Sequence, residues 1–340
     1  MSVFKPEAID TVVSKVHANS AGAWLEKIRV EISKIIFGQA DVVEAVLICL
    51  VAGGHILLEG APGLGKTKLL RTLANVLDLG YSRIQFTPDL MPGDIIGSMA
   101  LESEYPGQRK LVFQKGPVFS NLVLADEINR ASPRTQAALL EAMQEHTVTA
   151  GNTTYQLESP FFVMATQNPI EMEGTYPLPE AQLDRFLMKV LVSYPARRDL
   201  MRIVEATKET EEPVLSVVMA AEQVMDLRRE CRQLIVAPHV EEFAVDLIIA
   251  TQPGTPGAAT VTNRYVRYGS SPRGAQALIE CGRVRAASRG KLHLSIDDIL
   301  AVAPAVLRHR IIPSLEMYAD GQSVEAILTA TIAEVTSRRR

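Results

Sequence analysis

The chain contains few cysteines and no cysteine or histidine spacing typical of a metal site. Its 340 residues include three cysteines, Cys49, Cys231 and Cys281, which lie far apart and form no CxxC pair. Such an odd, scattered set argues against a disulfide scaffold or a thiolate metal site, and it fits a reducing compartment. The six histidines show no metal-ligand spacing either. We therefore expect the fold to rest on a hydrophobic core, which a chain of this length can form.

A basic stripe and a long apolar run are also absent. The formal net charge is −4, whereas nucleic-acid-binding domains usually carry a basic patch or stripe. The most apolar stretch, residues 45–58, is too short to span a bilayer and is interrupted by two glycines and a histidine. The start, MSVFKPEAIDTVVSK, is too polar for a signal peptide. We expect a cytoplasmic protein without membrane insertion, for which nucleic acid is an unfavoured partner.

Short apolar runs alternate with helical patterns in the first part of the chain. These runs predict buried strands, and strands separated by helices are typical of a mainly parallel α/β sheet. The predicted strands span residues 55–58, 84–86, 122–125, 161–165 and 187–192.

Helical periodicity dominates after residue 195. The predicted helices span residues 197–209, 219–232, 239–251, 273–288, 296–309 and 323–336. We therefore predict an α/β domain over residues 1–195, a linker or helix over residues 196–211, and an all-helical domain over residues 212–340.

The octapeptide GAPGLGKT, residues 60–67, meets the pattern G-x-x-x-x-G-K-[ST] between an apolar strand and a helix. The glycines let the backbone N–H groups point at phosphate oxygens, as does the N-terminus of the following helix. In such a loop the lysine, Lys66, reaches the β- and γ-phosphates, and the Thr67 hydroxyl ligates Mg²⁺. The alternative is an ordinary glycine-rich turn. The predicted nucleotide-binding residues are Gly60, Ala61, Pro62, Gly63, Leu64, Gly65, Lys66, Thr67 and Lys68.

Polar side chains follow two further predicted strands. Asp126 and Glu127 come directly after the strand at 122–125, at the edge where open α/β sheets bind ligands. Asp126 would hold Mg²⁺ and Glu127 would orient the attacking water and accept its proton; the alternative is an acidic cap for a helix at 133–145. Asn168 follows the strand at 161–165 and would touch the γ-phosphate or that water. Its alternative is a turn-forming residue before Pro169.

Longer strings of residues make the interpretation more specific. Beside GAPGLGKT, the chain contains LADEINRASPRTQAALLEAMQE, ATQNPIEMEGTYPLPEAQLDRF and SPRGAQAL, in residues 124–145, 165–186 and 271–278. In this order they resemble the MoxR family of AAA+ ATPases over nearly the whole chain. The resemblance implies a P-loop NTPase αβα core with a parallel sheet, followed by a helical lid, with ATP and Mg²⁺ bound. GAPGLGKT and the strand ending in Asp126 would be its Walker A and Walker B motifs.

The resemblance also implies residue roles that local sequence does not indicate. Asn168 matches sensor 1, and Arg185 matches the arginine finger that reaches the ATP of a neighbouring subunit. Arg273 matches sensor 2, which would touch the γ-phosphate from the lid. Gly38 and Gln39 match the segment that flanks the adenine. Without the resemblance, Arg185 and Arg273 would be interpreted as surface ion-pair residues.

Two segments have no nucleotide role of their own. The resemblance implies that residues 86–117 are the helix-2 insert and that residues 146–160 are the pre-sensor-1 hairpin, both facing the ring's pore or its partners. The alternative for each is an ordinary surface loop. Gln85 is a candidate polar switch that would contact Glu127 when no nucleotide is bound.

The function implied by the resemblance is that of a ring-forming, hexameric ATPase. It would hydrolyse ATP to remodel or mature a partner protein, often one with a von Willebrand factor A domain, by inserting a metal or cofactor. One alternative is a nucleic-acid motor or loader, which the acidic net charge disfavours. The other is a non-hydrolysing scaffold or switch, which the complete set Asp126, Glu127 and Arg185 disfavours.

Overall fold

The computed structural model describes residues 21–105, 108–169, 174–208 and 213–339. At its centre lies a five-stranded sheet with the strand order β2-β5-β8-β1-β9, in which every neighbouring pair is parallel. This confirms the predicted parallel sheet. The strand predicted at 84–86 starts earlier than expected and ends at Gln85. The strands are β1 (Ile56–Glu59), β2 (Tyr81–Gln85), β5 (Leu122–Asp126), β8 (Phe162–Gln167) and β9 (Met188–Leu191).

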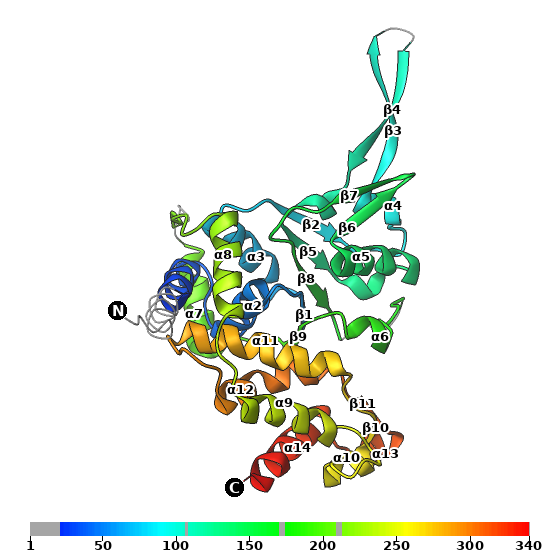
Figure 1. The fold of residues 1–340 in the computed structure, drawn as a ribbon. Coiled ribbons are helices and arrows are strands. Elements are labelled where there is room, and N and C mark those ends of the chain that lie inside the picture. Colours follow the sequence, from blue (N-terminus) through cyan, green and yellow to red (C-terminus); the bar gives the residue numbers. More distant parts are fainter. Residues whose placement is uncertain (1–20, 106–107, 170–173, 209–212, 340) are drawn as a thin grey trace, which may run out of the picture.

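Alternation along the strands divides the core between the two faces of the sheet. Ile56 and Leu58 belong to one buried cluster and Leu57 to the other, because successive side chains of a strand point to opposite faces. The first cluster includes the helix at residues 21–33, α2 (Ala40–Ala52) and α3 (Lys66–Val76). The second includes α5 (Pro133–Glu145). The predicted αβα layering is therefore confirmed (Figure 1).

Two hairpins leave the sheet on one side. The insert predicted at 86–117 contains α4 (Pro92–Ile96), β3 (Gly97–Tyr105), β4 (Gln108–Lys115) and the 3-10 turn η1 (Pro117–Phe119). Strands β3 and β4 pair antiparallel and form a long arm that projects from the body of the molecule (Figure 1). The second hairpin, β6 (Thr147–Ala150) with β7 (Thr153–Gln156), was expected. Phe113 of β4 stacks on Tyr155 of β7 at 4.5 Å between ring centroids, which joins the two hairpins at their base.

The second half of the chain is mainly helical, but it also contains short strand pairings. A short antiparallel pairing joins β10 (Val266–Tyr268) to β11 (Ile312–Pro313), which the predicted all-helical domain did not include. These strands are too short to give a recognisable period-two pattern. The helices after β9 are α7 (Arg197–Ala206), α8 (Ala221–Arg232), α9 (Pro238–Ala250), α10 (Thr260–Tyr265), α11 (Pro272–Ser288), α12 (Ile296–Leu307), α13 (Leu315–Ala319) and α14 (Val324–Arg338).

The helical half shares its core with the α/β half. Leu47 of α2, Leu227 of α8 and Leu278 of α11 belong to the same buried cluster, so apolar packing is continuous across the predicted boundary. The three cysteines are buried and unpaired. In the described part of the chain, no helix combines the length and apolar character needed to cross a membrane.

Candidate functional site

The GAPGLGKT loop connects the carboxyl end of β1 to α3. Gly60 N donates to Gln167 O at 3.2 Å, which attaches the start of the loop to the end of β8. A Cβ at Gly60 would lie 2.8 Å from Val192 O, so only glycine fits there. Gly65 ends the loop with φ of 74° and is the N-cap of α3. The first N–H groups of α3 have no acceptor within the helix and are available to an anion.

Lys66 points back across the loop. Its Nζ donates to Gly60 O at 2.7 Å. Burial lowers the pKa of Lys66, while Asp126, Glu127 and Glu59 act in the opposite direction. The ammonium group therefore lies at the mouth of the loop with carboxylates nearby, where it can exchange a carbonyl oxygen for phosphate oxygens.

A cavity of about 750 Å³ opens beside the loop. Gln39 Nε2 donates to Leu64 O at 2.5 Å, which brings the Gly38-Gln39 segment to the P-loop as expected. Gly38 has φ of 70°, and a Cβ there would lie 2.6 Å from Asp199 Cβ of α7. The lining residues include Ile36, Phe37, Gln39, Gly63, Gly65, Lys68, Tyr194, Leu200 and Ile203.

Helix α7 supplies a wall of this cavity that sequence analysis missed. Leu200 and Ile203 line it, together with Tyr194 just before the helix. The segment was assigned to a linker or helix without a role. Its apolar side chains recur at three- to four-residue spacing in Leu200, Ile203 and Val204, which was the available signal. The apolar residues and Gln39 suit a planar heterocycle that is hydrogen-bonded at its edge.

The acidic pair is held by strand β8. Asp126 ends β5, and its Oδ1 accepts a hydrogen bond from Thr166 Oγ1 at 2.7 Å. Glu127 adopts a left-handed conformation with φ of 57°, and its N donates to the same Thr166 Oγ1 at 2.8 Å. The Thr166 hydroxyl therefore orients the carboxylate of Asp126, the candidate metal ligand, and also binds the backbone of Glu127, the candidate base. The left-handed turn directs the Glu127 side chain away from the line of the strand.

Strand β2 covers the two carboxylates with Arg83 and Gln85. Arg83 binds Asp126 Oδ2 through Nη2 at 2.6 Å and Nε at 3.2 Å. Gln85 Nε2 donates to Glu127 Oε2 at 2.9 Å, and Gln85 Oε1 accepts from Arg83 Nη2 at 2.7 Å. The expected contact between Gln85 and Glu127 is therefore present. Arg83 was missed, although its i, i+2 spacing from Gln85 places both on one face of a strand.

The oxygen atoms at this edge suit magnesium. The hydroxyl of Thr67 and the carboxylate of Asp126 are hard oxygen ligands, and Mg²⁺ commonly takes one or two protein ligands and completes its shell with phosphates and water. Among the described residues, no group of three or more His, Cys, Asp or Glu side chains is arranged to hold a metal alone. The donor set therefore fits a metal that enters with the nucleotide.

Asn168 lies beside this edge, whereas Arg185 lies at the opposite one. Asn168 is buried and directly follows β8, next to the Gln167 carbonyl that anchors Gly60. Arg185 precedes β9, whose first residue Met188 pairs with Ile56 at the start of β1. Leu187 N also donates to His55 O, just before β1. The finger candidate is therefore at the amino-terminal edge of the sheet, away from the P-loop.

Arg273 accompanies Arg185. Its Nη1 lies 3.9 Å from Asp184 Oδ2, and both arginines line a second cavity of about 220 Å³. Within the described part of the chain, no hydrogen bond or ion pair engages the Arg185 guanidinium. The predicted site residues thus form two groups. Lys66, Asp126 and Asn168 lie with the P-loop, and Arg185 and Arg273 lie together at the other edge.

Comparisons with known proteins identify the family and the fold. Residues 55–188 match the family model described as "ATPase family associated with various cellular activities (AAA)", and residues 258–330 match the AAA lid domain. Chaperone MoxR1 of Mycobacterium tuberculosis is 38% identical over 330 residues, or 97% of this chain and 85% of that protein. Protein MoxR of Methylorubrum extorquens is 36% identical over 83% of this chain and 85% of its own length. A protein of known crystal structure from Cytophaga hutchinsonii superposes with a TM-score of 0.88 at 37% identity, covering 96% of this chain and 98% of that one.

Proposed function

The chain belongs to the MoxR family of AAA+ ATPases, and from that membership we propose that it hydrolyses ATP in a hexameric ring to remodel a partner protein. The observation that carries the proposal is the meeting of the P-loop, the acidic pair and Asn168 at the carboxyl edge of β1, β5 and β8. Open parallel sheets bind ligands at this edge. Here it combines anion-binding amides with carboxylates that can activate water.

Each residue has a distinct task in the proposed reaction. The amides of residues 60–65 and the Lys66 ammonium hold the β- and γ-phosphates. Glu127 orients the attacking water and accepts its proton, and Asn168 hydrogen-bonds that water or the γ-phosphate. Thr67 and Asp126 would hold Mg²⁺, which would supply positive charge to neutralise the phosphate oxygens. The adenine occupies the cavity beside Gln39 and α7.

We further propose that Arg185 and Arg273 both serve the ATP of a neighbouring subunit. Sequence resemblance suggested that Arg273 would touch the γ-phosphate from the lid. Its position beside Asp184, at the edge of the sheet opposite the P-loop, favours action in trans with Arg185. Two arginines on one face remain protonated and can fork onto phosphate oxygens across a subunit interface.

Mixed assemblies test this division of roles. Lys66→Ala should abolish ATP binding, and Glu127→Gln should bind ATP without turning it over. Arg185→Ala and Arg273→Ala should bind ATP but lose turnover, by about 10³-fold or more for a finger arginine. Mixing either arginine variant with Glu127→Gln should restore turnover, because Glu127→Gln subunits still offer both arginines to their neighbours. If Arg273 acts on its own subunit, the Arg273→Ala mixture stays inactive while the Arg185→Ala mixture recovers.

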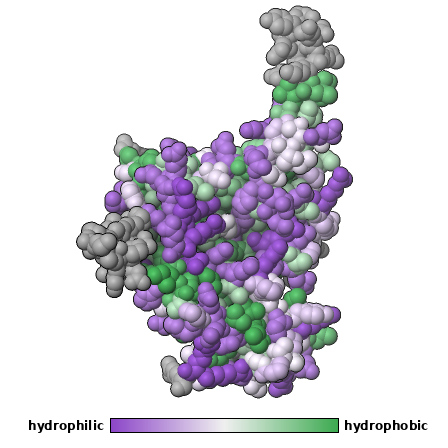
Figure 2. Space-filling model, viewed as in Figure 1, coloured by the Kyte–Doolittle hydropathy of each residue, from purple (hydrophilic) through white to green (hydrophobic). Residues whose placement is uncertain are grey.

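The projecting arm is the proposed contact with the partner protein. One face of β3–β4 exposes Met99, Leu101 and Leu111, with 48%, 64% and 60% of their surfaces accessible. Leu101 and Leu111 are direct cross-strand neighbours, and Figure 2 shows apolar colour along the arm below its tip. Exposed apolar patches of this kind mark protein contacts. The relative named Chaperone MoxR1 supports a chaperone-like role.

The partner class follows from the resemblance. We propose a protein with a von Willebrand factor A domain, matured by insertion of a metal or cofactor in the cytoplasm, a location supported by the three unpaired cysteines. The Glu127→Gln variant should capture this partner in the presence of ATP. Adding Leu101→Ser and Leu111→Ser should abolish capture, while the same two substitutions in the wild-type background should leave basal turnover unchanged. Retained capture would place the partner contact elsewhere.

A further inference from the structure

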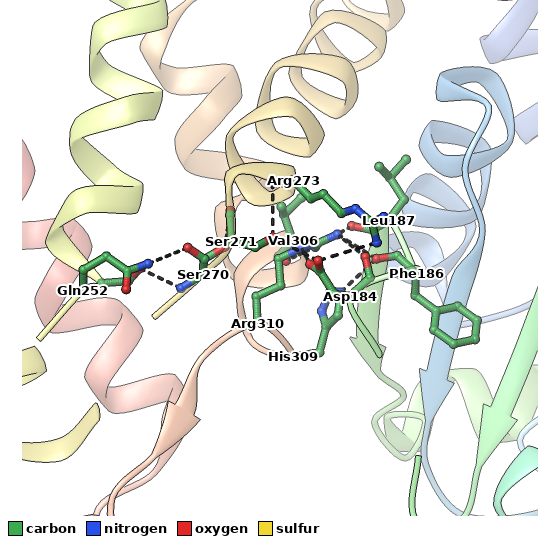
Figure 3. Close-up of polar contacts among 11 residues, drawn as sticks. Asp184, Phe186, Leu187, Gln252, Ser270, Ser271, Arg273, Val306, His309 and Arg310 are labelled. Atoms are coloured by element: carbon green, nitrogen blue, oxygen red, sulfur yellow. Dashed lines mark hydrogen bonds and ion pairs between the residues drawn. The ribbon is translucent and has the colours of Figure 1, made fainter. Parts of the chain in front are cut away.

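A buried arginine of the lid is bound to the segment that carries Arg185. Arg310 follows α12, and its side chain is 3% exposed. Its Nε donates to Asp184 Oδ1 at 2.8 Å, and its Nη2 donates to Phe186 O at 2.8 Å and to Asp184 O at 3.4 Å. Its Nη1 donates to Leu187 O at 3.1 Å and to Val306 O. Figure 3 shows this guanidinium among the side chain and carbonyls of residues 184–187.

These five contacts use every N–H donor of a guanidinium group. Four of the five acceptors belong to residues that flank Arg185 in sequence, and the fifth belongs to α12 of the lid. The backbone of the finger segment is therefore fixed by a side chain that is 125 positions away in the chain. Lysine has three donors on a single atom and cannot reproduce this fork.

The residues before Arg310 bind the same stretch of backbone. His309 Nε2 lies 2.9 Å from Phe186 O, and Arg308 Nη1 donates to Lys189 O at 2.9 Å. Burial and the neighbouring Arg310 charge hold the pKa of His309 well below its ordinary value, so this imidazole is neutral. We call residues 308–310 the lid clamp. Three successive lid side chains thus engage residues 184–189, which lead from the finger into β9.

Asp184 connects the clamp to the start of α11. Its Oδ2 accepts a hydrogen bond from Ser271 Oγ at 2.9 Å, and Arg273 Nη1 lies 3.9 Å from the same oxygen. Ser271 is the N-cap of α11, and its Oγ accepts from Arg273 N. One carboxylate therefore receives Arg310 on one oxygen and the helix bearing Arg273 on the other (Figure 3).

We propose that Arg310 is a positioning residue that holds Arg185 and Arg273 in one rigid unit for presentation to the neighbouring subunit. This inference rests on the proposed trans role of the two arginines. Because the clamp belongs to the lid and Arg185 to the α/β domain, a movement of the lid carries both arginines together. Arg310 contacts neither the P-loop nor Asp126 and Glu127 of its own subunit. Its loss should therefore impair the arginine finger that the subunit presents to its neighbour, while the ATP site of the same subunit remains intact.

The test uses Arg310→Met and Arg310→Lys in the full chain. Each variant alone should bind ATP with unchanged affinity and lose turnover by about tenfold or more, since a misplacement near 1 Å can cost about 10²-fold. Mixed with Glu127→Gln, which offers an intact finger, each should regain turnover to the level of the Arg185→Ala and Glu127→Gln mixture. Mixed with Arg185→Ala, neither should restore activity, because both partners then lack a working finger.

The control is Arg264→Met, which removes an ion pair to Asp320 within the lid and leaves the clamp intact. Its turnover should stay within about twofold of wild type, because an exposed ion pair contributes little to stability. Mixed with Arg185→Ala, whose own Glu127 is intact, it should supply a working finger and restore turnover at the Arg185→Ala sites. Arg310→Lys retains the buried charge beside Asp184, so it still tests the inference if Arg310→Met fails to fold.

Two results overturn the inference. In the first, a folded Arg310→Lys or Arg310→Met protein keeps wild-type turnover. In the second, either variant rescues Arg185→Ala, which shows that its finger is correctly placed. If mixing with Glu127→Gln does not restore turnover to Arg185→Ala, the proposed trans role of Arg185 is wrong, and the proposed role of Arg310 is wrong with it. The Arg185→Ala mixture therefore separates failure of the proposed function from failure of the clamp alone.

Discussion

Gln85 Nε2 donates a 2.9 Å hydrogen bond to Glu127 Oε2, so the candidate catalytic base is already engaged by a neutral side chain of β2. Arg130 Nη1 lies 3.1 Å from the same oxygen. A carboxylate oxygen held by two donors is a weaker acceptor for the attacking water. The position of Glu127 is thus set by residues outside the P-loop.

Replacement of Gln85 by alanine should raise basal turnover. Without the amide, Glu127 Oε2 loses one of its two donors and keeps only Arg130, so it becomes a better acceptor for the water proton. An increase of up to about tenfold corresponds to the free energy of one hydrogen bond of about 1.4 kcal/mol. Steady-state hydrolysis at saturating ATP measures the effect. Gln223→Ala, which removes an exposed hydrogen bond from Ala220 N at the start of α8, is the matched control. Lower turnover in Gln85→Ala would mean that the amide orients the base productively.

Arg83 should set the magnesium requirement of the site. Its guanidinium lies 2.6 Å from Asp126 Oδ2 and opposes a divalent cation at the same carboxylate. Arg83→Gln should therefore lower the Mg²⁺ concentration that gives half-maximal binding of a fluorescent ATP analogue. The expected shift is about fivefold or less, because an exposed ion pair contributes about 1 kcal/mol at most. Arg229→Gln, which disrupts an exposed pair in α8, should cause no shift. An increased requirement would show that Arg83 instead prepares Asp126 for the metal.

The root of the arm depends on Gly97. This residue has φ of 100°, and a Cβ there would lie 2.2 Å from Gln114 O on the paired strand. Gly97→Ala should therefore disrupt β3–β4 pairing at the base, reduce partner capture and increase protease cleavage within residues 97–115, with basal ATP hydrolysis retained. In Gly93→Ala the nearest atom to the new Cβ is 4.0 Å away, which makes it a matched control. Equal protease resistance in the two variants would contradict the prediction.

Acid should destabilise the protein through two buried histidines. Burial lowers the pKa of His55 to about 3 and the pKa of His309 well below its ordinary value. The unfolded chain, with a histidine pKa of about 6.5, binds protons that the folded chain does not, so the free energy of unfolding falls as pH falls below about 6.5. For His55 the loss is about 1.4 kcal/mol per pH unit, or roughly 2 kcal/mol at pH 5, and His309 acts in the same direction.

Urea unfolding at pH 7.5 and pH 5 measures this dependence. His55→Gln replaces the two hydrogen-bonding nitrogens, which contact Val163 N and Met143 O, with an amide that does not titrate. It should remove the contribution of His55 and leave that of His309. His239→Gln changes an exposed histidine and should leave the pH dependence as it is. An identical slope in His55→Gln and the wild type would show that His55 is not the group responsible.

The amino-acid sequence by itself determined the layered fold and predicted the nucleotide half of the candidate site. GAPGLGKT and the strand that ends in Asp126 each place their functional groups within one short segment, and an apolar strand followed by a loop specifies which edge those groups reach. The predicted contact of Gln85 with Glu127 is nearly as local, because β2 and β5 are neighbouring parallel strands. The arm was harder to predict, since its exposed Met99, Leu101 and Leu111 contribute no buried pattern.

Only the tertiary structure decided where the arginines lie and which groups hold them. Arg83 meets Asp126 and Arg310 meets Asp184 across 43 and 126 positions of the chain, and no periodic pattern encodes a single side-chain contact over such distances. Arg273 lies beside Arg185 because α11 starts against Asp184, at the amino-terminal edge of the sheet. Helix α7 lines the cavity beside the P-loop because the chain at Gly38 packs closely against Asp199. Functional groups that lie within one short segment can be predicted from the sequence. Contacts between groups from the two halves of the chain cannot, because they form only when packing brings distant segments together.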